Sequence, residues 1–207
     1  MRQSVLLYSY MATFHIHQKI TAFANQYRVF EDDNGKPGKV IAYAHQKRLA
    51  LKEKIIFYTD ETKQEEAFHL QARNIMELAG TYDVKDGTGE ILGVLRKQFK
   101  ASLLRSTWHV SAKNNEEAML LVQERSTGLA IARRVWGFVP YIGELPFFLK
   151  YHFDFVDLAL QQTVASYTKV TTFRDHYALT VEDATLENLD WRVLVAQGVA
   201  LDALQSR

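Results

Sequence analysis

The sequence predicts a mainly β protein, a closed antiparallel barrel of about twelve strands around a buried hydrophobic C-terminal helix. Two observations favour this fold. A strand, a polar turn and a return strand recur along the chain, and the last stretch is apolar on every side. Only three prolines, and no Ser- or Gly-rich linker, interrupt the 207 residues. We therefore expect residues 1–207 to form a single domain.

The repeated unit opens with an aromatic residue and an apolar residue two positions later, then turns at Asp, Asn or Gly and returns as a strand. Clear copies begin at Tyr27, Tyr82 and Trp108, and weaker copies begin at Tyr151 and Tyr177. A further hairpin, LKEKIIFYT–DETK–EEAFHLQAR, lacks the opening aromatic but has the same turn chemistry. Turns at about every dozen residues indicate an up-and-down order, as in a barrel or a sandwich.

The C-terminal stretch distinguishes the barrel from the sandwich. It is almost wholly apolar, and Arg192, Gln197 and Asp202 are scattered rather than gathered on one face. A helix that is apolar all round is buried or lies in lipid. This one is short for a membrane span of about 20 apolar residues, and it carries charges. A barrel of about a dozen strands is wide enough to admit a helix, so we predict a plug helix over about residues 186–205.

One segment, residues 126–144, does not follow the strand pattern. Its sequence, STGLAIARRVWGFVPYIGE, has no alternation of apolar and polar residues. The apolar spacing before Gly137 suits a short helix. We interpret the segment as a short helix or an irregular element at the rim of the barrel.

The bulk composition excludes several classes of function. A net charge of +1 gives no general preference for nucleic acid or membranes, so any such preference must come from local clustering. The absence of cysteine removes disulfides, thiolate nucleophiles and Cys-ligated metals. The N-terminus lacks the apolar region and cleavage site of a signal peptide. We expect a cytoplasmic protein with no transmembrane segment.

Five stretches, in their order and spacing, resemble the LURP-one-related family. They are QKITAFANQYRVFEDDNG (18–35), QKRLALKEKIIFYTDE (46–61), ARNIMELAGTYDV (72–84), GVLRKQFKASLLRSTWHV (93–110) and LDALQSR (201–207). The resemblance implies a twelve-stranded barrel around a C-terminal helix, similar to tubby C-terminal domains and phospholipid scramblases. Tubby domains bind phosphoinositides and scramblases act at membranes with calcium. Neither a scramblase calcium segment nor a tubby lipid site matches here residue by residue, so the resemblance carries no site residues.

Basic residues cluster around two connections between the predicted hairpins, whereas the hairpin turns are acidic. In an up-and-down barrel these two sets lie at opposite ends. We name the basic set the basic rim and predict that it attracts anionic phospholipid headgroups. In the other interpretation these residues are solvated strand ends that keep the protein from aggregating. The basic rim comprises Lys47, Arg48, Lys52, Lys54, Arg96, Lys97, Lys100 and Arg105.

Candidate metal and catalytic groups are sparse. His15 and His17 share one face of a strand, but two ligands do not make a metal site. Asp154, Asp157 and the later carboxylates Asp175 and Glu182 have no glycosidase or calcium-loop spacing, and DGTGE (86–90) reads as a hairpin turn. Motifs of an activated nucleophile, a P-loop or a dinucleotide fold are missing. We expect no catalysis, metal or cofactor.

These observations favour a non-catalytic cytoplasmic binding module, located at the membrane periphery if the basic rim holds phospholipid. The alternative is a protein-interaction scaffold with no lipid role. Nucleic acid is a poor candidate, because the chain lacks the basic excess of such proteins. Exchange of the plug helix for a lipid tail is the least favourable interpretation, since it would expose a large apolar interior.

Overall fold

A computed structural model describes residues 10–21, 24–47, 54–73, 80–98, 106–113, 115, 117–126, 152–171 and 175–204. Twelve antiparallel strands and two helices account for most of these residues. The elements are β1 (Met11–Ile20), β2 (Ala24–Asp33), β3 (Lys36–Lys47), β4 (Lys54–Tyr58), β5 (Glu66–Ala72), β6 (Thr81–Asp86), β7 (Ile91–Lys97), β8 (Thr107–Ala112), β9 (Leu120–Glu124), β10 (His152–Asp157), β11 (Gln162–Lys169), β12 (Asp175–Glu182), α2 (Asp183–Leu186) and α3 (Trp191–Ala203).

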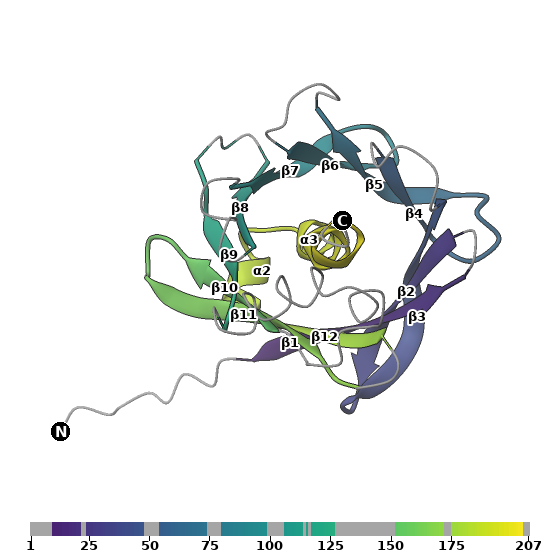
Figure 1. The fold of residues 1–207 in the computed structure, drawn as a ribbon, viewed down its shortest axis with the longest axis horizontal. Coiled ribbons are helices and arrows are strands. Elements are labelled where there is room, and N and C mark those ends of the chain that lie inside the picture. Colours follow the sequence, from purple (N-terminus) through teal and green to yellow (C-terminus); the bar gives the residue numbers. More distant parts are fainter. Residues whose placement is uncertain are drawn as a thin grey trace, which may run out of the picture.

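The strands close into a barrel around α3, which Figure 1 shows near the middle of the ring. Each strand pairs with its neighbours in sequence, and β12 pairs back onto β1. That closing pair runs from Met11 opposite Glu182 to Gln18 opposite Asp175. The predicted fold class is therefore confirmed.

The predicted hairpins correspond to β2–β3, β4–β5, β6–β7, β8–β9 and β10–β11. In the first of them Asn34 and Gly35 both have positive φ, 54° and 80°, as a type I′ turn requires. The copy that begins at Tyr177 is not a hairpin, because β12 leads into α2. Apart from Ser126, the predicted short helix or rim element at 126–144 lies outside the described residues.

The plug helix is α3, and it begins at Trp191 rather than near residue 186. Asp190 caps it by accepting a hydrogen bond from the Arg192 backbone N–H at 2.9 Å. Ten of its thirteen residues are buried, as the all-round apolar sequence predicts. Its polar Arg192 turns back onto the Asp190 carboxylate, with Nη2 2.6 Å from Oδ2.

Aromatic residues and glycines fit the wall closely to the plug. The Trp191 ring stacks on Phe14 and meets Phe68 edge-on, with ring centroids 5.6 and 5.8 Å apart. On β7, a Cβ added at Gly93 would lie 2.9 Å from the Cγ atoms of Val193. The wall therefore approaches the helix more closely there than any other residue type would permit.

Gln197 is the exception in this apolar interior. It is 0% exposed, and neither its amide nitrogen nor its amide oxygen has a hydrogen-bond partner among the described residues. A buried amide without partners loses its hydration and gains nothing in exchange. The Gln197 amide therefore lowers the free energy of unfolding.

Replacing Gln197 with Met keeps the side-chain length and removes the unpartnered amide. We expect Gln197→Met to raise the free energy of unfolding by about 1–3 kcal/mol, measured by urea titration. The matched control is Leu201→Met on the same helix, which should cost less than about 1.5 kcal/mol. A Gln197→Met protein less stable than the parent would show that the amide has a partner in solution.

Candidate functional site

The barrel has two chemically different ends. One end carries the hairpin turns; the other carries the connections between hairpins and the C-terminal end of α3. Four basic-rim residues fall at this second end: Lys47 ends β3, Lys54 begins β4, and Arg96 and Lys97 end β7. Arg48, Lys52, Lys100 and Arg105 lie outside the described residues, as does the side chain of Lys47.

The described basic-rim side chains have different surroundings. Lys54 Nζ lies 3.7 Å from Glu66 Oε2, a loose and partly exposed ion pair. Lys97 Nζ lies 5.6 Å from the ring centroid of Trp108, within the range of a cation–π contact. Arg96 is half-buried on the outer side of β7. The three described side chains, those of Lys54, Lys97 and Arg96, thus have no common partner.

Barrel closure adds further cations that the sequence analysis missed. Lys19 near the end of β1, Arg125 after β9 and Lys169 at the end of β11 occupy the same end of the barrel. Each is isolated in sequence, so no cluster signals it. Arg125 pairs with Asp154, with Nη2 2.5 Å from Oδ1, and Lys169 Nζ lies 2.7 Å from Asp175 Oδ1. The charges of Arg125 and Lys169 are therefore largely neutralised.

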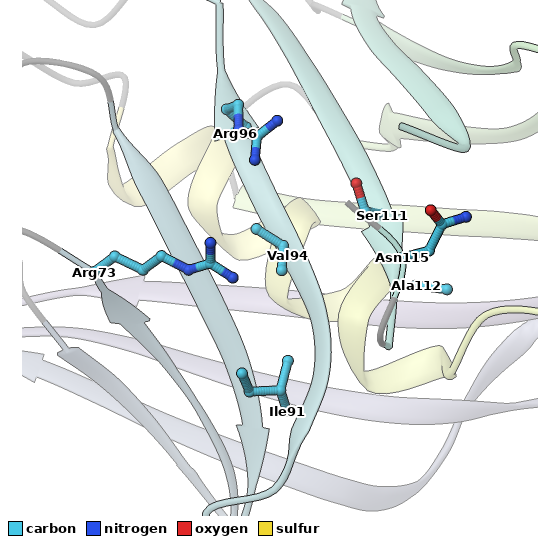
Figure 2. Close-up of a pocket in the computed structure, with 7 residues that line it drawn as sticks. All are labelled: Arg73, Ile91, Val94, Arg96, Ser111, Ala112 and Asn115. Carbon is cyan, nitrogen blue, oxygen red and sulfur yellow. The ribbon is translucent and has the colours of Figure 1, made fainter. Parts of the chain in front are cut away.

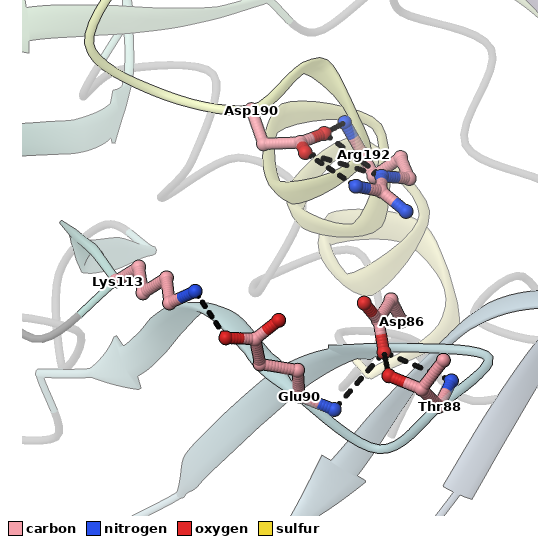
Figure 3. Close-up of polar contacts among 6 residues, drawn as sticks. All are labelled: Asp86, Thr88, Glu90, Lys113, Asp190 and Arg192. Atoms are coloured by element: carbon pink, nitrogen blue, oxygen red, sulfur yellow. Dashed lines mark hydrogen bonds and ion pairs between the residues drawn. The ribbon is translucent and has the colours of Figure 1, made fainter.

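The acidic hairpin turns use their carboxylates to hold the turns. In the DGTGE turn, Asp86 Oδ1 accepts hydrogen bonds from the Thr88 hydroxyl, the Thr88 N–H and the Glu90 N–H at 2.7–3.0 Å (Figure 3). These bonds, the Thr88 hydroxyl first, lower the pKa of Asp86. Glu90 also forms an ion pair with Lys113. This stretch is thus a hairpin turn.

The side chain of one acidic turn residue reaches away from the hairpin end. Glu61, between β4 and β5, reaches the outer wall of β2, where the Arg28 Nε donates to Glu61 Oε1 at 2.6 Å. This bond, the largest cause, lowers the pKa of Glu61. The separation of acidic and basic ends is therefore less complete than the sequence pattern predicts.

The H-x-H pair lies on the outer face of β1, but its two rings have different partners. The ring of His15 contacts Asp32, with Nε2 and Oδ1 2.7 Å apart. His17 stacks on His176 with ring centroids 3.7 Å apart. Burial, followed by the charge of His176, lowers the pKa of His17 to about 4, so it is neutral at pH 7. Within the described ranges, no three His, Asp or Glu side chains group as metal ligands.

The carboxylates considered as a catalytic pair each bind a different partner. Asp154 binds Arg125, Asp175 binds Lys169, and Asp157 accepts from the backbone N–H groups of Ala159 and Leu160 at 2.8 Å. Asp154 and Asp175 thus belong to ion pairs and Asp157 to a turn, while Asp157 and Glu182 line one pocket of about 160 Å³.

A half-buried carboxylate lies at the basic end of the barrel. Asp202, in the last turn of α3, accepts hydrogen bonds from Tyr27 Oη at 2.7 Å, Gln18 Nε2 at 2.5 Å and Tyr177 Oη at 3.3 Å. Three strands, β1, β2 and β12, are thereby tied to the plug. Burial is the main cause that raises the pKa of Asp202, and the negative end of the helix dipole acts in the same direction.

The family model for LURP-one-related proteins matches residues 40–202, which run from β3 almost to the end of α3. The chain therefore belongs to the LURP-one-related family. Comparison with curated proteins gives no matching sequence. Neither helix in the described ranges is long and apolar enough to cross a membrane.

Replacing Asp202 with Asn tests how the charge of Asp202, which anchors the plug helix to three strands, affects stability. Asn offers one oxygen to Gln18 and Tyr27 and an N–H to Tyr177, so the three contacts are kept. The folded protein binds the Asp202 proton more tightly than the unfolded chain does. The stabilisation that this bound proton gives the folded protein is therefore lost as the pH rises above about 4. We expect Asp202→Asn to be at least as stable as the parent at pH 7, with the difference shrinking toward pH 4.

The control is Asp202→Leu, which removes the acceptor of Tyr27 and Gln18 and should cost about 1–3 kcal/mol. Urea unfolding at a series of pH values measures both variants. A loss of stability in Asp202→Asn that is largest at pH 7 would contradict this view of the anchor.

Proposed function

We propose that this protein is a non-catalytic binding module that attaches to anionic phospholipid surfaces through its basic rim. The observation that carries the proposal is topological. Up-and-down closure gathers the ends of β3, β4 and β7 at one end of the barrel, and these ends supply Lys47, Lys54, Arg96 and Lys97. Each Lys or Arg near an anionic bilayer contributes about 1 kcal/mol of attraction. Several such residues make a reversible surface contact.

Exposed apolar residues lie at both ends of the barrel, including the basic end. Ile20 ends β1 and is 55% exposed, and Val170 follows β11 and is 51% exposed. Apolar side chains beside basic ones suit the boundary between headgroups and acyl chains. Exposed Leu160 and Met11 lie at the hairpin end, but the acidic turns there would repel an anionic surface. Charge, rather than apolar exposure, distinguishes the two ends.

Family membership supports phospholipid binding only through the shared fold. The resemblance of LURP-one-related proteins to tubby C-terminal domains links the barrel to phosphoinositide binding, but a shared fold does not fix a function. The proposal places the protein in the cytoplasm, where the inner leaflet supplies anionic lipid.

A scaffold role is the second candidate. The ion pairs Lys54–Glu66, Arg125–Asp154 and Lys169–Asp175 favour it, because they neutralise part of the charge at the basic end. A barrel whose remaining cations serve only solubility would present its surface to one protein partner and ignore lipid and salt.

Co-sedimentation with neutral and anionic vesicles separates the two functions. We expect binding only to anionic vesicles, weaker at physiological than at low salt because the contact is screened. Charge reversal to Glu at Lys47, Arg48, Lys52 and Lys54 should weaken binding by at least about a hundredfold. The matched control reverses four cations of the hairpin end, Lys36, Lys39, Lys63 and Lys113, and should bind like the parent.

Absence of binding to anionic vesicles at low salt would refute the lipid function. Equal losses in both reversed proteins would also refute it, because net charge rather than the basic rim would then control binding. Recovery of one stoichiometric partner in pull-downs, insensitive to either reversal, would establish the scaffold.

A further inference from the structure

A recessed pocket of about 300 Å³ lies on the outer wall over β7 and β8. Figure 2 shows Arg73, which follows β5, extending toward Val94 on β7, with Arg96 farther along β7 and Ser111 on the far side. We call it the outer-wall pocket. Its size is at the lower end of the range for small-molecule sites.

The strand register explains which side chains line the outer-wall pocket. Gly93 and Leu95 face the plug, so the alternation along β7 turns Val94 and Arg96 outward. Val94 pairs with Ser111 on β8. Although both face outward, Val94 is only 8% and Ser111 5% exposed. The pocket is therefore a recess with an apolar floor, to which Ile91 contributes, rather than an open patch.

The charge of the outer-wall pocket is not balanced. Arg73 Nε donates to Asp83 Oδ1 at 2.7 Å, which leaves the terminal nitrogens of Arg73 without a partner in the described ranges. Among the described residues, Arg96 has no ion pair or hydrogen bond from its guanidinium, and it pairs across the strands with His109. Burial, followed by the charge of Arg96, lowers the pKa of His109 and so favours its neutral form. The pocket thus has two guanidinium groups in its lining, and among the described residues the Asp83 carboxylate pairs with that of Arg73 alone.

The remaining polar groups are suited to donate hydrogen bonds. Asn115 Oδ1 already accepts from the Glu117 N–H at 2.9 Å, so the Asn115 amide has its N–H groups to offer. Ser111 supplies a hydroxyl from the same side. A site that combines two arginines, an amide N–H and a hydroxyl is complementary to an oxyanion, and guanidinium groups bind phosphate in bidentate fashion.

We propose that the outer-wall pocket binds a small phosphate ester, with its phosphate between Arg73 and Arg96 and its apolar part on Ile91 and Val94. The ester can be a soluble molecule or the headgroup of a lipid, since both present the same chemistry. The site shares Arg96 with the basic rim, but it lies on the wall and binds without a membrane.

The test is titration of the ¹⁵N-labelled full-length protein with phenyl phosphate, followed by NMR and calorimetry. We expect saturable shifts at the amides of Val94, Arg96 and Ser111, with tighter binding than inorganic phosphate or phenol. Arg96→Gln leaves no described partner unpaired and should weaken binding at least about tenfold, as should Arg73→Gln. The control Arg125→Gln removes a cation that does not line the pocket and should bind like the parent.

Two further titrations keep this site separate from the membrane function. The protein reversed at Lys47, Arg48, Lys52 and Lys54 should still bind phenyl phosphate, even where it no longer binds vesicles. A short-chain phosphatidic acid below its micelle concentration identifies a lipid source if it binds more tightly than phenyl phosphate, and a soluble source if it does not. Absence of saturable shifts, unchanged affinity in Arg96→Gln, or equal affinity for inorganic phosphate would overturn the proposal.

Discussion

The width of a twelve-stranded barrel is the constraint on which the rest of the structure depends. Side chains from the wall fill a barrel of about eight strands, but a wider ring leaves space along its axis. Here α3 fills that space, and the wall meets it with aromatic rings at Phe14 and Phe68 and with a glycine at Gly93. The helix must be apolar on every side because strands surround it. Polar contacts are confined mainly to its ends, at Asp190 and Asp202.

Filling the interior also limits where function can lie. Among the described residues α3 fills the axis, one pocket lies on the outer wall over β7 and β8, and another lies beside α2 near the hairpin end. The hairpin end uses its carboxylates to hold turns, as at Asp86. The opposite end gathers cations around the anchor of the plug. The recess beside Arg96 connects that end to the wall, and a lipid contact and a small-anion site can therefore occupy neighbouring surfaces.

Much of the fold was predictable because its signals are local. Turn residues such as Asn34-Gly35 identify hairpins, and an all-round apolar stretch identifies a plug. The basic rim was found where cations cluster in sequence, as around Lys47 and Lys54. Lys19 and Arg125 were missed because only barrel closure brings them to that end. The outer-wall pocket was missed for the same reason, since Arg73 and Ser111 are distant in sequence and line one pocket only when the strands pair. The contact between Glu61 and Arg28 was not predicted, because the two residues lie on separate hairpins.

Removal of the plug tests most directly whether the barrel depends on it. A chain ending at Asp190 lacks α3 but keeps all twelve strands. A barrel left with an empty apolar axis should lose cooperative unfolding and its fixed aromatic environment, seen by calorimetry and near-ultraviolet circular dichroism. A shortened protein that still melts cooperatively near the full-length temperature would show that the wall is stable by itself and that α3 is not its core.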